Sequence, residues 1–170
     1  MPEDKDDSVE DDFDEDEDED MQKDKYLTFR IGKEVYGIEI YHVLEIVAVQ
    51  KITPVPDMPD YVKGLINLRG QIIPIMDVRT RFHIAQQDYD DRTCIIIVRI
   101  EDTLEDTTVG LAVDAVDEVA DIPNADVSPP PKTGRKRGAD SYIKGMGRTD
   151  EGVKIILDVG RLLFKVRSEK

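Results

Sequence analysis

The sequence contains no tryptophan, one cysteine and two histidines among its 170 residues, and only 6 % of them are aromatic. A lone cysteine excludes a disulfide framework, and because Cys94 lies among β-branched residues we interpret it as an inert core residue. Neither His42 nor His83 has a cysteine, histidine or carboxylate at ligand spacing on a shared face, so we predict no metal site. With no tryptophan and few aromatic residues, a base-stacking platform for single-stranded nucleic acid is unsupported.

Long apolar runs are also missing. The longest uninterrupted runs are only a few residues, which predicts no membrane span, and the acidic start has no apolar core of a signal peptide. Neither GxGxxG nor GxxxxGK[ST] occurs, so nothing predicts a phosphate-binding loop. Three hydroxyl residues, Ser128, Ser141 and Thr149, lie near acids, but no histidine groups with them in a triad. We therefore predict neither catalytic residues nor a cofactor.

The formal net charge of −15 is concentrated at the N-terminus. Residues 1–24 hold fifteen acids against two lysines, whereas the rest of the chain holds 23 acids against 21 bases. We predict a disordered acidic tail over 1–24, serving either as a solubility brush or as an electrostatic tail for a basic partner or for the basic segment 132–137. No aromatic residue interleaves with that basic segment, so we interpret it as a solvated loop and predict no nucleic-acid partner.

The rest of the chain is a series of short strands. Alternating apolar residues predict a hairpin of strands 26–31 and 35–40, then a short helical turn leading into a strand over 41–49. Further strands are expected at 62–68, 71–76, 93–100 and 109–113, and the near-continuous β-branched content of 93–100 predicts burial on both faces. Pro74 lacks a backbone donor, which predicts an edge or bulge position. Asp77 is interpreted as the N-cap of a helix at 78–82.

The sequence repeats itself. Residues 36–45 match 109–118 at a shift of 73, and residues 61–77 match 142–158 at a shift of 81, with the eight additional residues in the basic turn-like segment 129–138. Asp77 and Asp158 share the same context, so capping explains them better than a catalytic pair. Each half forms a unit of about five short strands, and closure of such a unit into a small barrel removes exposed edges. Two barrels related by a pseudo-twofold axis, with a groove between them, are the expected arrangement.

A family resemblance is carried by YGIEIYHVLEIV (36–47), PDYVKGLINLRGQIIPIMDVRTRF (59–82), VGLAVDAVDEV (109–119) and YIKGMG (142–147). Over residues 25–166 the chain resembles CheW, the chemotaxis coupling protein family. The resemblance implies a mainly β fold of two intertwined five-stranded SH3-like barrels with short helices. The two subdomains are expected at about residues 25–90 and 91–166, and strands can be exchanged between them. It also implies a cytoplasmic, non-catalytic adaptor that links methyl-accepting chemoreceptors to the histidine kinase CheA in membrane-associated arrays.

By the same resemblance, the cytoplasmic tip of the receptor docks in the groove between the subdomains. The residues predicted for receptor binding are Val43, Glu45, Gly64 and Arg69. Structural roles stay open beside this one, namely core packing for Val43 and a backbone-geometry requirement for Gly64, which Gly145 repeats. Arg69 lies at a turn tip between apolar strands, and we hypothesise that it pairs with Glu45 and so holds the receptor-facing surface in place.

The regulatory domain of the kinase is implied to dock on barrel ends, and we predict Ile52 and Val55 for that contact. A related alternative is the coupling domain of a CheV-type protein, in which a response-regulator receiver domain follows. The sequence ends at Lys170, directly after the duplicated helix, so we expect no receiver domain. An enzyme built on small barrels is the competing class from outside signalling, and the lack of a convergent acid–base–nucleophile set disfavours it.

Overall fold

The computed structural model describes residues 22–101, 106–130 and 142–164. Ser141, the basic segment 132–137 and all but the last three residues of the predicted acidic tail lie outside the described residues. The strands are β1 Lys25–Ile31, β2 Glu34–Glu39, β3 Val43–Ala48, β4 Val62–Leu68, β5 Gln71–Asp77, β6 Cys94–Glu101, β7 Asp106–Val113, β8 Ala115–Asp121, β9 Val127–Ser128, β10 Ile143–Thr149 and β11 Gly152–Leu157. The helices are η1 Ile40–His42, α3 Val78–Arg81, η2 Asn124–Asp126 and α4 Val159–Phe164.

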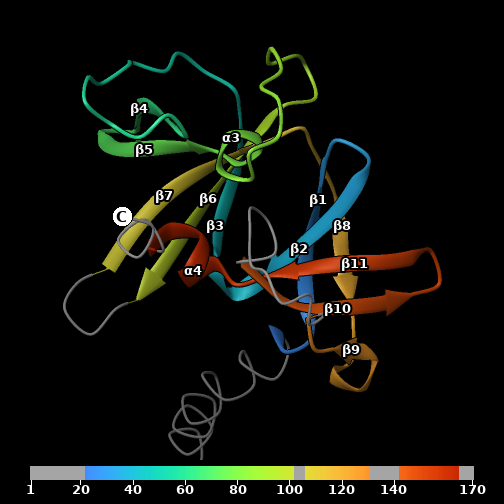
Figure 1. The fold of residues 1–170 in the computed structure, drawn as a ribbon. Coiled ribbons are helices and arrows are strands. Elements are labelled where there is room, and N and C mark those ends of the chain that lie inside the picture. The colour runs from blue at the N-terminus through green and yellow to red at the C-terminus, as the bar shows by residue number, and fades with distance from the viewer. Residues whose placement is uncertain (1–21, 102–105, 131–141, 165–170) are drawn as a thin grey trace, which may run out of the picture.

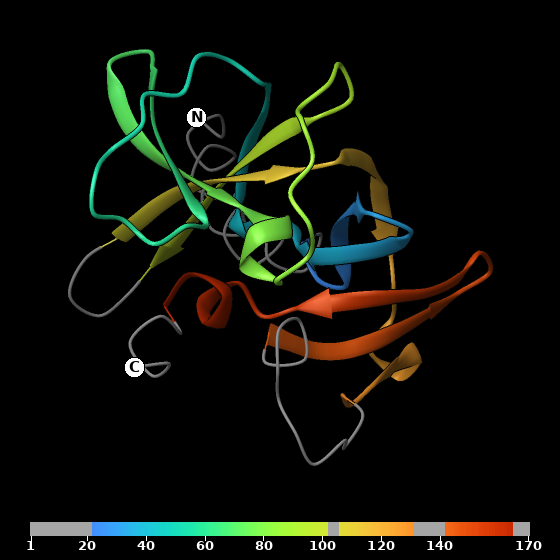
Figure 2. The same ribbon diagram turned by 45° about the horizontal axis from the view of Figure 1, so that its top comes forward.

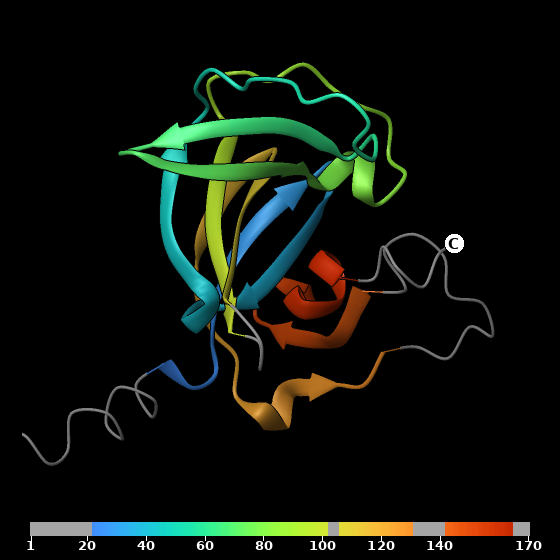
Figure 3. The same cartoon turned by 90° about the vertical axis from the view of Figure 1, so that its left-hand side faces the viewer.

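These strands form two sheets, with orders β8-β1-β2-β11-β10-β9 and β3-β6-β7-β5-β4 (Figure 1). Each sheet therefore contains strands from both halves of the sequence, joined by the parallel pairs β2 with β11 and β5 with β7. The β4–β5 hairpin and β9 lie at opposite ends of the molecule (Figure 3). The prediction of a mainly β fold with two SH3-like barrels is confirmed, and the two-residue strand β9 gives the first sheet a sixth strand.

The two sheets repeat each other strand by strand. The order of the second sheet is β3-β6-β7-β5-β4. The first sheet has the equivalent strands in the same order, β8-β1-β2-β11-β10. Both terminal hairpins carry a register shift at the same place, between Val62 and Gly64 in β4 and between Ile143 and Gly145 in β10. The outer edge of β10 pairs with β9, and the outer edge of β4 is bridged by Thr53. The duplication read from the sequence is thus a duplication of sheet topology.

The main hydrophobic core lies between the two sheets, and each barrel has a smaller interior of its own. Strand β6 is buried on both faces, as predicted, because its two faces line different cores. Its Ile96 and Val98 belong to the central core, while Ile95 and Ile97 belong to the interior of the barrel formed by the second sheet. Because side chains alternate along a strand, one strand can line two cores.

Helices α3 and α4 meet between the sheets (Figure 2), where the Nε of Arg81 donates to the carbonyl of Leu162 at 3.1 Å. Both helices begin at the predicted aspartate caps. Asp77 accepts from the N–H of Thr80 at 3.1 Å, and Asp158 accepts from the N–H of Arg161 at 3.0 Å. Each cap satisfies a backbone donor that a helix start leaves free, so the capping interpretation is confirmed.

Pro74 lies inside β5, which is not an edge strand, and the register shift of the hairpin lies opposite Ile75 and Met76, so the predicted edge or bulge position is wrong. Its partner on β4 is Leu65, whose N–H and carbonyl bond to Thr53 on the far side, so Pro74 and Leu65 form a pair without hydrogen bonds between them. On the other side, the ladder to β7 begins only at Ile75. Pro74 is tolerated because no neighbour there needs its missing donor.

Candidate functional site

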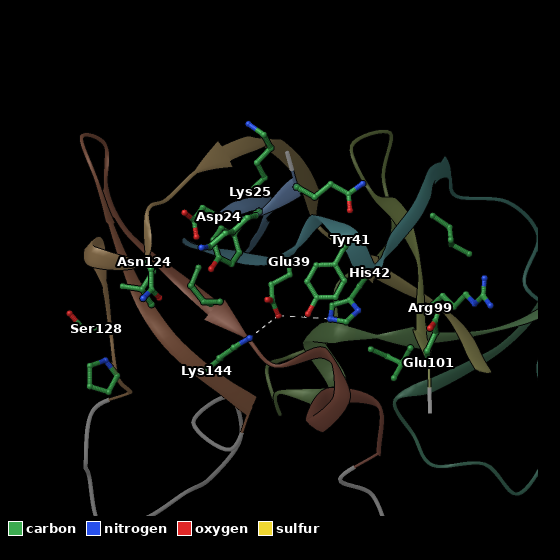
Figure 4. A pocket seen from close by; sticks show the side chains of 18 residues that line it. Asp24, Lys25, Glu39, Tyr41, His42, Arg99, Glu101, Asn124, Ser128 and Lys144 are labelled. Atoms are coloured by element: carbon green, nitrogen blue, oxygen red, sulfur yellow. Dashed lines mark hydrogen bonds and ion pairs between the residues drawn. The ribbon is translucent and has the colours of Figure 1, made fainter. Parts of the chain in front are cut away.

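A groove with a volume of about 1310 Å³ lies between the first sheet and the ends of β3 and β6. Its walls come from both sheets, with β1, β2, η1, β10 and β11 on one side and β3 and β6 on the other, and with η2 and β9 closing one end (Figure 4). The lining combines apolar, aromatic and charged side chains, which are Gln22, Lys23, Asp24, Lys25, Tyr26, Glu39, Tyr41, His42, Leu44, Arg99, Ile100, Glu101, Asn124, Val127, Ser128, Pro129, Lys144 and Ile156.

Glu39 is the polar centre of the groove. Lys144 of β10 donates to its carboxylate at 2.8 Å, and the Nε2 of His42 lies 3.9 Å from the same oxygen (Figure 4). Glu39 is also the residue before η1, but its side chain makes no capping bond to that turn. Its carboxylate is therefore available to hold a strand from the other half of the sequence.

The groove changes the acid–base behaviour of its side chains. Burial lowers the pKa of His42 below its usual 6.5, although the Glu39 carboxylate opposes this shift. Burial also works to lower the pKa of Lys144, but the hydrogen bond and charge of Glu39 outweigh it, and the net shift is upward. At neutral pH the groove thus contains a charged lysine–glutamate pair beside a neutral imidazole.

Aromatic and aliphatic side chains are displayed at the mouth of the groove. Tyr41 packs against His42 with tilted rings whose centroids are 4.2 Å apart, yet 56 % of its surface is exposed. Leu44 on β3 is 52 % exposed. Exposed apolar side chains of this size beside charged groups are typical of surfaces that bind protein.

The predicted ion pair between Arg69 and Glu45 is confirmed, and it lies outside the groove lining. The β4–β5 turn that presents Arg69 is tight: Arg69 and Gly70 both have positive φ, and the Gly70 N–H donates to the Asn67 side chain at 2.8 Å. The pair is solvent-accessible, with 67 % of the Arg69 side chain exposed. An exposed pair of this kind contributes little to stability, about 0–1 kcal/mol.

The equivalent place on the other barrel has no such pair. Glu118 stands at the position of Glu45, and Asp150 stands at that of Arg69. The neighbouring Glu151 carboxylate raises the pKa of Glu118, so like charges meet where the first copy has opposite ones. The turn there is held instead by Thr149, whose hydroxyl donates to the carbonyl of Gly152 at 2.8 Å.

The other predicted residues have largely structural surroundings. Val43 is half-buried and packs against the central core. Gly64 has φ +144°, and a Cβ there would lie 2.2 Å from the carbonyl oxygen of Thr53, so only glycine fits. Ile52 packs against the barrel interior beside Gly64, and Val55 is half-buried further along the same connection.

None of the four residues predicted for receptor binding lines the groove, but β3 joins the two places. Leu44 lines the groove, while its neighbours Val43 and Glu45 do not, and β3 is the edge strand of its sheet. The sequence did not predict Tyr41, His42 and Lys144 as groove residues. The only signal in the sequence was the pair of rings of Tyr41 and His42 directly after a predicted strand, and Lys144 had no such signal.

No arrangement for catalysis or metal binding emerges in the part of the chain that the structure describes. Among these residues no group of three histidine, cysteine, aspartate or glutamate side chains could hold a metal ion. The buried Asp77 accepts a bond from the Tyr89 hydroxyl at 2.6 Å, and burial followed by that bond raises the pKa of Tyr89. Across the described ranges, no helix is long and apolar enough to cross a membrane.

Comparison with known proteins agrees with this geometry. Residues 25–167 match the CheW-like domain family. The chain is 35 % identical over 144 residues to the chemotaxis protein CheW of Treponema pallidum, which covers 85 % of this chain and 84 % of that protein. It is 34 % identical over 139 residues to the chemotaxis protein CheW of Klebsiella aerogenes, covering 82 % and 81 %.

Among solved structures, the crystal structure of the scaffolding protein TtCheW from Thermoanaerobacter tengcongensis superposes with a TM-score of 0.74. The two sequences are 35 % identical, and the match covers 83 % of this chain and 92 % of the other. The protein therefore belongs to the CheW-like family of chemotaxis scaffold proteins.

Proposed function

We propose that this protein is a non-catalytic adaptor that couples methyl-accepting chemoreceptors to the histidine kinase CheA in cytoplasmic arrays beneath the membrane. The proposal is supported by family membership and carried by one observation, the large groove between the sheets with exposed Tyr41 and Leu44 at its mouth. A scaffold needs accessible surface that binds protein, and this groove offers exposed apolar contact area at its mouth around a charged centre.

The receptor tip, a helical hairpin, lies in the groove and along the edge of β3. There it contacts Leu44 from the groove side and reaches Glu45 and Arg69 on the other side of the strand. The Arg69–Glu45 pair holds both side chains in one orientation, which favours a specific partner more than it favours stability. Val43 supports β3 from the core, and Gly64 keeps the neighbouring connection close to β4.

The regulatory domain of the kinase binds a separate surface at the end of the barrel formed by the second sheet. Ile52 and Val55 lie there in the connection between β3 and β4, which the Thr53–Leu65 bridge fastens to the barrel. Both side chains are half-buried, so each presents part of its apolar surface. Two separate surfaces would let one chain hold receptor and kinase together.

Isothermal titration calorimetry with a purified chemoreceptor signalling hairpin and a CheA regulatory domain tests the proposal. Both should bind the wild-type chain. Leu44→Glu and Arg69→Ala should weaken receptor binding at least tenfold and leave kinase binding within twofold. The matched control is Val153→Glu, an equally exposed apolar position at 53 % that lies outside the groove lining. Failure of the wild-type chain to bind either partner would overturn the proposal.

A further inference from the structure

The groove lies where the acidic N-terminal segment joins the folded chain. The described chain begins at Gln22, and residues 22–25 all line the groove. Residues 1–21 carry fourteen carboxylates against a single lysine. Phe13 is their only aromatic residue, and it interrupts the run of nine acids at 11–20. This segment therefore starts at the rim of the groove and combines dense negative charge with one large apolar side chain.

The groove offers complementary groups. Its side chains include four cations and three carboxylates, which are Lys23, Lys25, Arg99 and Lys144 against Asp24, Glu39 and Glu101. The cation of Lys144 sits towards the centre, and Tyr41 and Leu44 provide exposed apolar surface for a phenyl ring. Lys144 already pairs with Glu39, Lys25 with Asp121 and Arg99 with Asp106. The lining therefore has a net charge of only +1 beside its exposed apolar side chains, and the phenyl ring of the segment is the better match to the groove.

Tethering makes even a weak contact effective. Eight residues separate Phe13 from Gln22, and an extended chain of that length spans up to about 30 Å. A short flexible tether gives an effective concentration on the order of millimolar. A segment whose free peptide binds with a dissociation constant of about 1 mM would therefore fill the groove about half of the time.

We propose that residues 1–21 occupy the groove of their own chain, with Phe13 against Leu44 and Tyr41 and its flanking carboxylates near Lys144. The segment is then an intramolecular competitor for whatever protein the groove binds. The contact itself does not depend on the proposed function, whereas the competition with a receptor does. Screening by salt weakens the contact, because the Debye length falls from about 10 Å at 0.1 M to about 3 Å at 1 M.

The absence of tryptophan makes a direct test simple. In the full chain, Phe13→Trp introduces a single tryptophan, whose emission and acrylamide quenching report its burial. We expect the quenching constant at low salt to be at least twofold below that of a free peptide of residues 1–21 carrying the same substitution. At 1 M salt the two constants should converge. Equal constants at low salt would overturn the contact.

Groove variants then locate the site. Added to Phe13→Trp, Leu44→Glu and Lys144→Gln should raise quenching to the level of the free peptide. Their matched controls are Val153→Glu and Lys33→Gln, which make the same changes outside the groove lining and should leave quenching unchanged. If the controls act as strongly as the groove variants, the segment is not in this groove.

The competition has its own readout. Adding a chemoreceptor signalling hairpin that binds the chain should return the Phe13→Trp emission to that of the free peptide. If the receptor binds and the emission stays unchanged, the segment does not compete and that part of the inference is wrong. If the receptor does not bind at all, the proposed function fails, while the quenching data still decide the contact.

Discussion

Gly64 distinguishes a structural requirement from a recognition role. A Cβ added at this position would lie 2.2 Å from the Thr53 carbonyl oxygen and 2.9 Å from a methyl group of Ile52. Gly64→Ala must therefore push the connection away from β4 and break the paired bonds between Thr53 and Leu65, which are 2.8 and 2.9 Å long. Each lost bond contributes about 1 kcal/mol, and the positive φ adds about 1–3 kcal/mol of strain.

We expect Gly64→Ala to lower the free energy of unfolding by about 3–5 kcal/mol, a large share of the 5–15 kcal/mol of an ordinary domain. The assay is chemical denaturation followed by far-UV circular dichroism, since the chain has no tryptophan. Gly70→Ala is the matched control, because its φ is also positive, at +89°, but nothing lies within 4 Å of an added Cβ. It should lower the free energy of unfolding by only about 1 kcal/mol.

Gly145 provides a graded comparison. It stands at the same register shift in β10, and a Cβ there would meet the Ser128 carbonyl oxygen at 2.8 Å rather than 2.2 Å. Gly145→Ala should therefore fall between the other two variants. If Gly64→Ala proves no more destabilising than Gly70→Ala, the steric reasoning is wrong, and any loss of receptor binding in that variant reflects recognition.

Three further predictions concern other parts of the molecule. Arg69→Ala should change the free energy of unfolding by less than about 1 kcal/mol, because its pair with Glu45 is exposed; a larger loss in denaturation would make the pair structural. Arg81→Ala should lower that free energy by about 3 kcal/mol, because the buried guanidinium lies 4.3 Å from the ring centre of Tyr61 and donates to Leu162; unchanged thermal unfolding would contradict this. The pKa of His42 is lower in the folded chain than in the unfolded chain, so below about pH 6.5 the unfolded chain binds more protons and the free energy of unfolding should fall. His42→Gln should lack this part of the fall when the two proteins are denatured at pH 7.5 and at pH 5.5. An equal fall in both would contradict the role of His42.

Local patterns predicted the individual elements well. Alternating apolar residues placed the hairpins, because a strand that covers a core must point every second side chain inward. Asp77 and Asp158 were identified as caps because their position before a short helix meets a fixed need of any helix start. The pairing of Arg69 with Glu45 was also foreseen from a charged residue at a turn tip.

Pro74 shows where such reasoning fails. A rule about missing donors predicted an edge or bulge position, but β5 is an inner strand whose pairing with β7 begins only after the proline, at Ile75. The end point of a neighbouring strand depends on distant parts of the chain. A local pattern contains no information about it.

The sequence by itself determined the strands, the capped helices, the duplication and the family resemblance, since each depends on residues close together or on direct repetition. Only the tertiary structure decided which strands pair across the two halves and where the groove lies. Glu39 and Lys144 are 105 positions apart and meet because β2, β11 and β10 share one sheet. The apolar pattern of a strand does not name its partner, so it fits pairing within a half or between halves, and only packing of the whole core selects between them.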